Sequence, residues 1–281
     1  MNLMVTGSAA SYSLKFGNSV TELLGIGFGA GAGVLLGALV SISISGGHLN
    51  PIVTTALAIT RGFDYRKVMC YVTAQYLGAF SATALVFANY YNAINAFDGG
   101  IRSGFGENTS TGMIFTTFPN PSASIYGVLL DQIICASLVM MAVLTVMDDT
   151  NLQIPKYLIP VLISIIICGV IVSFGFNCGA ALNPARDLSA RVFLLLVGYG
   201  DDVFLPLNGL YWLIGGIIGP HLGALVGSVI YLMLIDIQHK TCEHIVDDRS
   251  DECTQMGSNN APNEPIQAIE GQEDIIAITD K

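Results

Sequence analysis

Charged residues are scarce in this sequence: they make up 11% of its 281 residues, whereas hydrophobic residues make up 52%. In soluble globular domains about 25% of residues are charged. This scarcity, with a mean hydropathy of +0.62, excludes a soluble domain of ordinary composition. The composition therefore predicts an all-α protein that passes through a lipid bilayer several times.

Basic residues are the scarcer kind of charge, at 11 against 21 acidic residues, which gives a formal net charge of −10. Most of this charge lies at the end of the chain, because residues 236–281 hold 11 acidic and 3 basic residues. The remainder is close to neutral, so no nucleic-acid partner is expected. We expect residues 239–281 to form a disordered acidic tail in the cytoplasm.

Clustered cysteines are also absent. The six cysteines have neither the spacing of a metal site nor that of a disulfide framework. We interpret them as free thiols and expect no metal and no cofactor. The apolar segments hold no pair of nucleophile and base, so an enzyme is not expected.

Five apolar segments are long enough to span a bilayer, which takes about 20 helical residues. The first carries Gly25, Gly29, Gly33 and Gly37, and the last carries a similar glycine series from 215 to 227. Small residues at this interval form a groove in which another helix can pack closely. The predicted spans are 20–45, 68–91, 125–147, 157–176 and 210–235, with residues 92–124 as a polar connection.

Two Asn-Pro pairs stand in matched settings, each after a long apolar segment and a turn of small residues. Asn is a favoured N-cap, and proline is well suited to the first helical position. Asn50-Pro51-Ile52 and Asn183-Pro184-Ala185 are therefore predicted to begin helices that end near 61 and 196. These helices are too short to cross a bilayer. They are expected to be re-entrant half-helices of an inverted repeat whose N-termini meet at the midplane.

The basic loop 61–67 predicts the orientation, because short basic loops stay in the cytoplasm. The half-helices then enter from opposite sides, and 92–124 lies outside. There Asn108 begins an N-glycosylation sequon, Asn-Thr-Ser. Residues 1–19 are too weakly apolar for a span, and 20–238 are expected to form the channel domain.

Paired helix N-termini at the midplane repel cations, and the two Asn side chains offer amide donors. Water bound there would have its hydrogens turned outward, which interrupts a proton chain. Arg186 lies within membrane depth, where an arginine is costly and usually functional. These features favour a passive channel for water and small neutral solutes that excludes ions and protons.

The motifs S-G-G-H-L-N-P at 45–51 and N-P-A-R-D at 183–187 resemble the paired signatures of the aquaporin family of major intrinsic proteins. Asp187 and Arg191 look like markers of its aquaglyceroporin branch. The resemblance implies glycerol as a solute, a homotetramer with one pore per subunit and no cofactor. The plasma membrane is the expected location.

By spacing from these signatures, the resemblance places the outer filter at Ala30, Ile171, Ala180 and Arg186. Family filters usually include an aromatic residue, which is missing here, so a wide filter is expected unless nearby Phe28 takes the place of Ala30. Ile52 stands where the first signature usually has alanine. Its added bulk could shift the preceding Asn50.

The resemblance also implies six spans, of which residues 1–19 resemble only the end of the first. Without that helix, the glycines at 25–37 are expected to face lipid. A non-conducting, truncated isoform that regulates longer family members is therefore an alternative to a channel. An ion-coupled transporter is a further alternative, but the spans offer it only Glu22 and Asp131, both near span ends.

Overall fold

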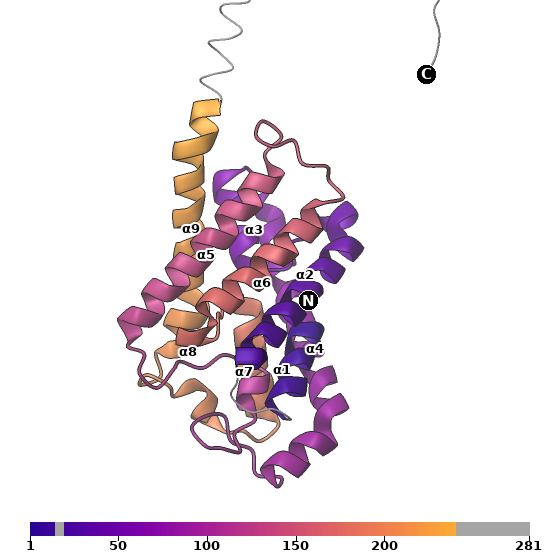
Figure 1. Cartoon of the computed structure of the whole chain (residues 1–281), viewed down its shortest axis with the longest axis vertical. Helices are drawn as coiled ribbons and strands as arrows, with labels where there is room; N and C mark the ends of the chain where they lie inside the picture. The colour runs from indigo at the N-terminus through magenta and orange to yellow at the C-terminus, as the bar shows by residue number, and fades with distance from the viewer. Residues whose placement is uncertain (15–19, 240–281) are drawn as a thin grey trace, which may run out of the picture. The chain divides into compact units, whose positions relative to one another are not determined.

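The computed structural model describes residues 1–14 and 20–239, and their regular elements are helical throughout (Figure 1). The expected tail from 240 onward lies outside the described residues. In chain order the elements are α1 (Asn2–Ser13), α2 (Val20–Ser45), α3 (Pro51–Thr60), α4 (Tyr65–Asp98), η1 (Gly112–Ile114), α5 (Ile125–Met147), α6 (Ile159–Cys178), α7 (Pro184–Leu196), η2 (Asp201–Phe204), α8 (Tyr211–Leu213), η3 (Ile214–Ile218), α9 (Gly219–Tyr231) and η4 (Leu232–Asp236).

Five helical segments of the described residues are long and apolar enough to cross a membrane, which confirms the five predicted spans. Their bounds are Leu23–Ser45, Tyr65–Asp98, Ile125–Met147, Ile159–Cys178 and Tyr211–His239.

The prediction of a polar connection from residue 92 was wrong, because α4 continues to Asp98. The helix begins after Asp64, whose side chain caps the backbone N–H of Arg66, and it ends at Gly99 in the left-handed conformation. The Asp98 carboxylate at its end accepts hydrogen bonds from Arg102, 2.6 and 2.8 Å long. This local ion pair satisfies the charged residue at the end of α4. Hydropathy alone does not detect such a contact, so it does not predict that the helix continues.

Helix α1 covers the glycine series of α2. A Cβ atom added to Gly33 would lie 2.6 Å from the Met1 carbonyl oxygen, and one added to Gly29 would overlap the Ser8 hydroxyl. The expectation that these glycines face lipid was therefore wrong. At 1.5 Å per residue α1 is about 18 Å long, which is less than the hydrocarbon core of about 30 Å.

Close packing on glycine also joins the other long helices. Helix α2 packs on α6, where a Cβ on Gly31 would lie 2.6 Å from the Ser164 carbonyl oxygen. Helix α9 lies alongside α5 (Figure 1), and a Cβ on Gly223 would lie 2.6 Å from the Ile133 carbonyl oxygen. In lipid, such contacts supply the van der Waals attraction that holds helices together.

The two half-helices begin where the Asn-Pro pairs predict. Asn50 caps α3 and Asn183 caps α7, each in an extended backbone conformation with proline at the next position. The turn before α3 uses Gly46 and Gly47 with φ of 73° and 70°. Two short helices thus begin inside an assembly of long ones.

Candidate functional site

The two half-helices are joined through their capping side chains. Asn50 Nδ2 donates to the Leu182 carbonyl oxygen at 3.0 Å, and Asn183 Nδ2 donates to the Leu49 carbonyl oxygen at 3.0 Å. Each asparagine therefore bonds the residue that precedes the other. An amide group has two N–H donors, and Asn183 Nδ2 also donates weakly to Met1 Sδ at 3.9 Å.

The bulk of Ile52 does not displace Asn50. Ile52 is fully buried, and its backbone N–H donates to Asn50 Oδ1 at 3.1 Å, as in a regular N-cap. Asn183 Oδ1 accepts the equivalent bond from Ala185 N at 3.1 Å and another from Arg186 N at 3.2 Å. The residues that follow the two asparagines, Pro51, Pro184 and Ala185, are also buried.

A cavity of ≈ 110 Å³ leads to Asn50 from one side of the site. Its lining is mainly aliphatic, and two helices each contribute a stripe of side chains spaced four positions apart. Helix α2 contributes Val34, Ala38 and Ile42, and α6 contributes Ile159, Ile163 and Ile167. His48 and Leu49 from the turn before α3 also line it, as does Met1.

The expected filter positions continue these stripes beyond the cavity. Ala30 precedes Val34 by one helical turn, and Ile171 follows Ile167 by one turn. Both belong to one buried hydrophobic cluster with Ala180. Phe28 is 72% exposed, so it does not replace Ala30. Ala30 and Ala180 are each 3% exposed, so packing is close here despite their small side chains.

Arg186 lies on the first turn of α7, outside that hydrophobic cluster. Its Nε atom is buried and has no hydrogen-bond partner among the described residues. A buried donor without a partner is costly unless something else supplies an acceptor.

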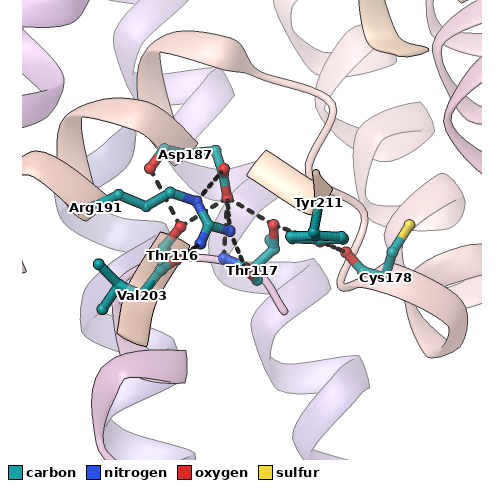
Figure 2. A network of polar contacts seen from close by, with 7 residues as sticks. All are labelled: Thr116, Thr117, Cys178, Asp187, Arg191, Val203 and Tyr211. Atoms are coloured by element: carbon teal, nitrogen blue, oxygen red, sulfur yellow. Dashed lines mark hydrogen bonds and ion pairs between the residues drawn. The ribbon is translucent and has the colours of Figure 1, made fainter. Parts of the chain in front are cut away.

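Asp187 and Arg191 form a buried polar network with a segment distant in sequence (Figure 2). Asp187 Oδ1 accepts from Thr116 Oγ1 at 2.7 Å and from Thr117 Oγ1 at 2.6 Å. Arg191 Nε donates to Asp187 Oδ2 at 2.7 Å, and its other nitrogens donate to the carbonyl oxygens of Thr117 and Val203. The network ties α7 to the segment before α5 and to η2.

Aromatic rings enclose the Arg191 guanidinium. Its carbon lies 5.2 Å from the centroid of Phe118 and 5.3 Å from that of Tyr211, at cation–π distance. Gly216 packs directly against Asp187, because a Cβ at this position would lie 2.7 Å from Asp187 Oδ2. The two expected markers, Asp187 and Arg191, are therefore structural partners that fix the second half-helix.

A family model described as Major intrinsic protein matches residues 1–231. The chain belongs to the major intrinsic protein family. It is a multi-pass membrane protein of a channel family that is not enzymatic. Among the residues that the structure describes, no cluster of histidine, cysteine or acidic side chains could hold a metal ion.

The channel is similar to several named relatives. It is 39% identical over 216 residues to Aquaporin-3 of Milnesium tardigradum, covering 77% of this chain and 66% of the relative. It is 39% identical over 225 residues to Aquaporin-9 of Rattus norvegicus, covering 80% and 74%. For Aquaglyceroporin-2 of Rhizophagus irregularis the identity is 38% over 219 residues, covering 78% and 67%. The chain thus spans 66 to 74% of the length of these relatives.

A solved structure has the same fold. The X-ray structure of the aquaglyceroporin from Plasmodium falciparum matches 85% of this channel and 94% of that chain, with a TM-score of 0.73 and 29% identity. The predicted resemblance to the aquaglyceroporin branch and the predicted all-α fold are both confirmed.

A glutamine of this channel supports each turn that leads into a half-helix. Gln132 Oε1 accepts from Leu182 N at 2.9 Å, which holds a residue in the left-handed conformation, with φ of 49°. Gln75 Nε2 donates to the His48 carbonyl oxygen at 2.9 Å. Both glutamines lie outside the two Asn-Pro motifs, so no local pattern indicates this role.

The thiols of Cys135 and Cys178 lie beside the Asp131 carboxylate, near the turn that leads into α7. Cys178 Sγ donates to Asp131 Oδ2 at 2.8 Å, and Asn177 Nδ2 donates to Asp131 Oδ1 at 2.9 Å. Cys178 and Cys135 are fully buried. Asp131 thus holds the end of α6.

Proposed function

We propose that this protein is a passive channel for water and small neutral solutes such as glycerol. The reciprocal bonds between the two half-helices carry this proposal. They hold Asn50 and Asn183 at the point where two helix N-termini meet, with one N–H of each committed to the opposite turn. The second N–H of Asn183 has only the weak acceptor Met1 Sδ at 3.9 Å, which a solute oxygen would replace. A solute oxygen would accept from both amides in turn.

Ion exclusion follows from the same arrangement. The N-terminal ends of α3 and α7 carry partial positive charge, which repels cations at the midplane. Arg186 adds a full positive charge on the first turn of α7, and its buried Nε lacks a hydrogen-bond partner among the described residues. We assign Ala30, Ile171 and Ala180 to the wall opposite these donors.

The cavity favours solutes that carry both hydroxyl and CH groups. Its ≈ 110 Å³ exceeds the share of one water molecule in the liquid, about 30 Å³. A polyol such as glycerol can place its carbon side on the aliphatic stripes while its hydroxyls meet the polar edge near Asn50.

In the assembly we propose, four identical subunits each hold one pore in the plasma membrane. The apolar side chains exposed on α2, including Leu36, Val40 and Ile44, are suited to neighbouring subunits or lipid. The loop 61–67 and the tail from 239 would lie in the cytoplasm. Asn108, which is exposed, would lie outside and carry the glycan.

Swelling of proteoliposomes after osmotic steps in glycerol and sorbitol tests the channel. We expect glycerol entry that an ionophore does not change. Ala38→Trp places a large ring in the cavity and should reduce glycerol flux by roughly 10-fold or more, whereas Leu36→Trp, 54% exposed on the same helix, should conduct normally. Flux that collapses with the ionophore contradicts a passive channel. A folded chain without flux supports the non-conducting regulatory form instead.

A further inference from the structure

Arg61 joins three elements at the end of α3 that lies away from Asn50. It is the C-cap of α3, and its backbone N–H donates to the Leu57 carbonyl oxygen at 2.9 Å. Its guanidinium donates to Asp236 Oδ1 at 2.9 Å and lies 4.0 Å from Asp148 Oδ2. Asp148 follows α5 and Asp236 ends η4, so one side chain contacts the ends of both.

The acids are less exposed than the arginine that they share. The side chains of Asp148 and Asp236 are 5% and 7% exposed, against 30% for Arg61. Tyr231 donates its hydroxyl to Asp148 Oδ2 at 2.8 Å, and its ring centroid lies 6.0 Å from the Arg61 guanidinium carbon. Arg61 is itself exposed, so the ion pairs are partly screened by solvent, but the two acids that it joins are both buried.

The π-helical turn η4 aligns two of these partners. Tyr231 and Asp236 are five positions apart, which in an α-helix of 3.6 residues per turn would direct them to different sides. A π turn bonds residue i to i+5 and returns the chain to the same side. The irregularity therefore lies where Tyr231 and Asp236 both contact Arg61.

Helix α3 has no charged side chain among its ten residues, P-I-V-T-T-A-L-A-I-T. Near Asn50 it is also bonded to α4, because Gln75 Nε2 donates to Thr54 Oγ1 at 2.9 Å, so Arg61 provides the ionic contact at the opposite end. A short helix is stiff, so movement at Arg61 is passed on to Asn50 at the opposite end. By contrast, α7 carries an ion pair of its own, between Asp187 and Arg191.

We propose that Arg61 is a positioning residue that sets the location of Asn50 by anchoring α3 to Asp148 and Asp236. This proposal rests on the proposed channel function. Its consequence is a change in selectivity: when the anchor is lost, Asn50 moves relative to Asn183, and the two amides no longer present their donors to one solute.

The test measures glycerol and water flux in proteoliposomes, per folded molecule, for Arg61→Gln and Arg61→Lys. We expect Arg61→Gln to change the glycerol-to-water flux ratio by roughly 3-fold or more. Arg61→Lys keeps the charge and should restore most of the parent ratio. Arg66→Gln, an exposed residue of the same loop, is the matched control and should leave the ratio unchanged.

A charge reversal covers the case in which Arg61→Gln does not fold. Arg61→Asp with Asp236→Arg and Asp148→Asn rebuilds the ion pair in the opposite sense without placing two acids side by side, and it should recover the ratio that Arg61→Asp alone loses. An unchanged ratio in folded Arg61→Gln, or no recovery in the reversed pair, overturns the positioning role. Absence of glycerol flux in the parent would instead contradict the channel function, so the two failures are distinguishable.

Discussion

Arg191 Nε donates to Asp187 Oδ2 at 2.7 Å within α7, and neither side chain is more than 1% exposed. The arginine is held by two backbone carbonyl oxygens as well, so its charge is fully coordinated away from lipid and water. Since charge within the membrane is costly, this pair can exist only because every one of its partners is in place.

Replacing Arg191 by leucine should therefore destabilise the channel strongly. The change leaves the Asp187 carboxylate buried without its cation, and breaking a buried pair in this way costs about 3–5 kcal/mol. Thermal unfolding followed by the fluorescence of Trp212, the single tryptophan of the sequence, measures the loss. Arg66→Leu is the control, because Arg66 is exposed. Equal unfolding midpoints for the two variants would contradict the structural importance of the network.

The glycine contacts between α5 and α9 give a second prediction. A Cβ at Gly227 would overlap the Ser137 carbonyl, which is backbone and cannot turn aside. Gly227→Ala should separate the helices and cost about 1–3 kcal/mol through over-packing. Gly78 has no atom within 4 Å of its added Cβ, so Gly78→Ala should be neutral or slightly stabilising. The same thermal measurement compares the two, and a neutral Gly227→Ala would show that the helices are less tightly packed.

The spans and half-helices could be predicted because their signals are local. Apolar runs, glycines at helical spacing and an Asn before a proline all act within one element. The partners of Asp187 could not be predicted, since Thr116 and Thr117 lie about 70 positions away and stand in a loop without periodicity. A Thr-Thr pair in an outer loop is too common to indicate a buried acid.

The π turns were missed for a related reason. Tyr211 and Gly216 contact the Asp187 network from one side of the last span although they are five positions apart. Gly216 lies within the turn η3, and Asp236 is the last residue of the turn η4, so each tyrosine is followed by a π turn that holds its partner. Such a turn is formed because of its tertiary contacts, and the apolar sequence around it is equally compatible with a regular α-helix.

Asp148 makes stability depend on pH. Burial alone would raise its pKa, but hydrogen bonds from Thr150 and Tyr231 and the charge of Arg61 hold the pKa below its ordinary value of 3.8. The folded state thus binds this proton less readily than the unfolded state, so the stabilisation is complete above the unfolded pKa and is lost as pH falls through the folded one.

Asp148→Asn should accordingly lower the unfolding midpoint at about pH 7, and its difference from the parent should shrink as pH falls below about 4. Unfolding midpoints of both proteins across that range provide the measurement. Asp149→Asn alters an exposed neighbour and should show no such convergence. A constant difference at all pH values would show that the carboxylate contributes through shape instead of charge.

Orientation in the membrane gives a fourth prediction. A cysteine at position 66 should react with an impermeant thiol reagent only after cells are permeabilised, because the basic loop 61–67 is expected in the cytoplasm. The parent, which keeps its six cysteines, supplies the background. In a host that glycosylates, the parent should lose apparent mass on treatment with an N-glycosidase, and Asn108→Gln should not. Labelling of position 66 from outside intact cells would reverse the proposed topology.

Removal of the charge at Arg186 should make the channel permeable to ions. Its Nε has no hydrogen-bond partner among the described residues, and we place its charge in the path of the solute. A barrier lowered by only about 1.4 kcal/mol raises a rate roughly tenfold. We therefore expect Arg186→Val proteoliposomes to leak protons at least that much faster than the parent, measured with an enclosed pH-sensitive dye. Arg186→Lys keeps the positive charge and should remain tight. If Arg186→Val is as tight as the parent, exclusion must come from the N-termini of α3 and α7 alone, since these are unchanged in the variant.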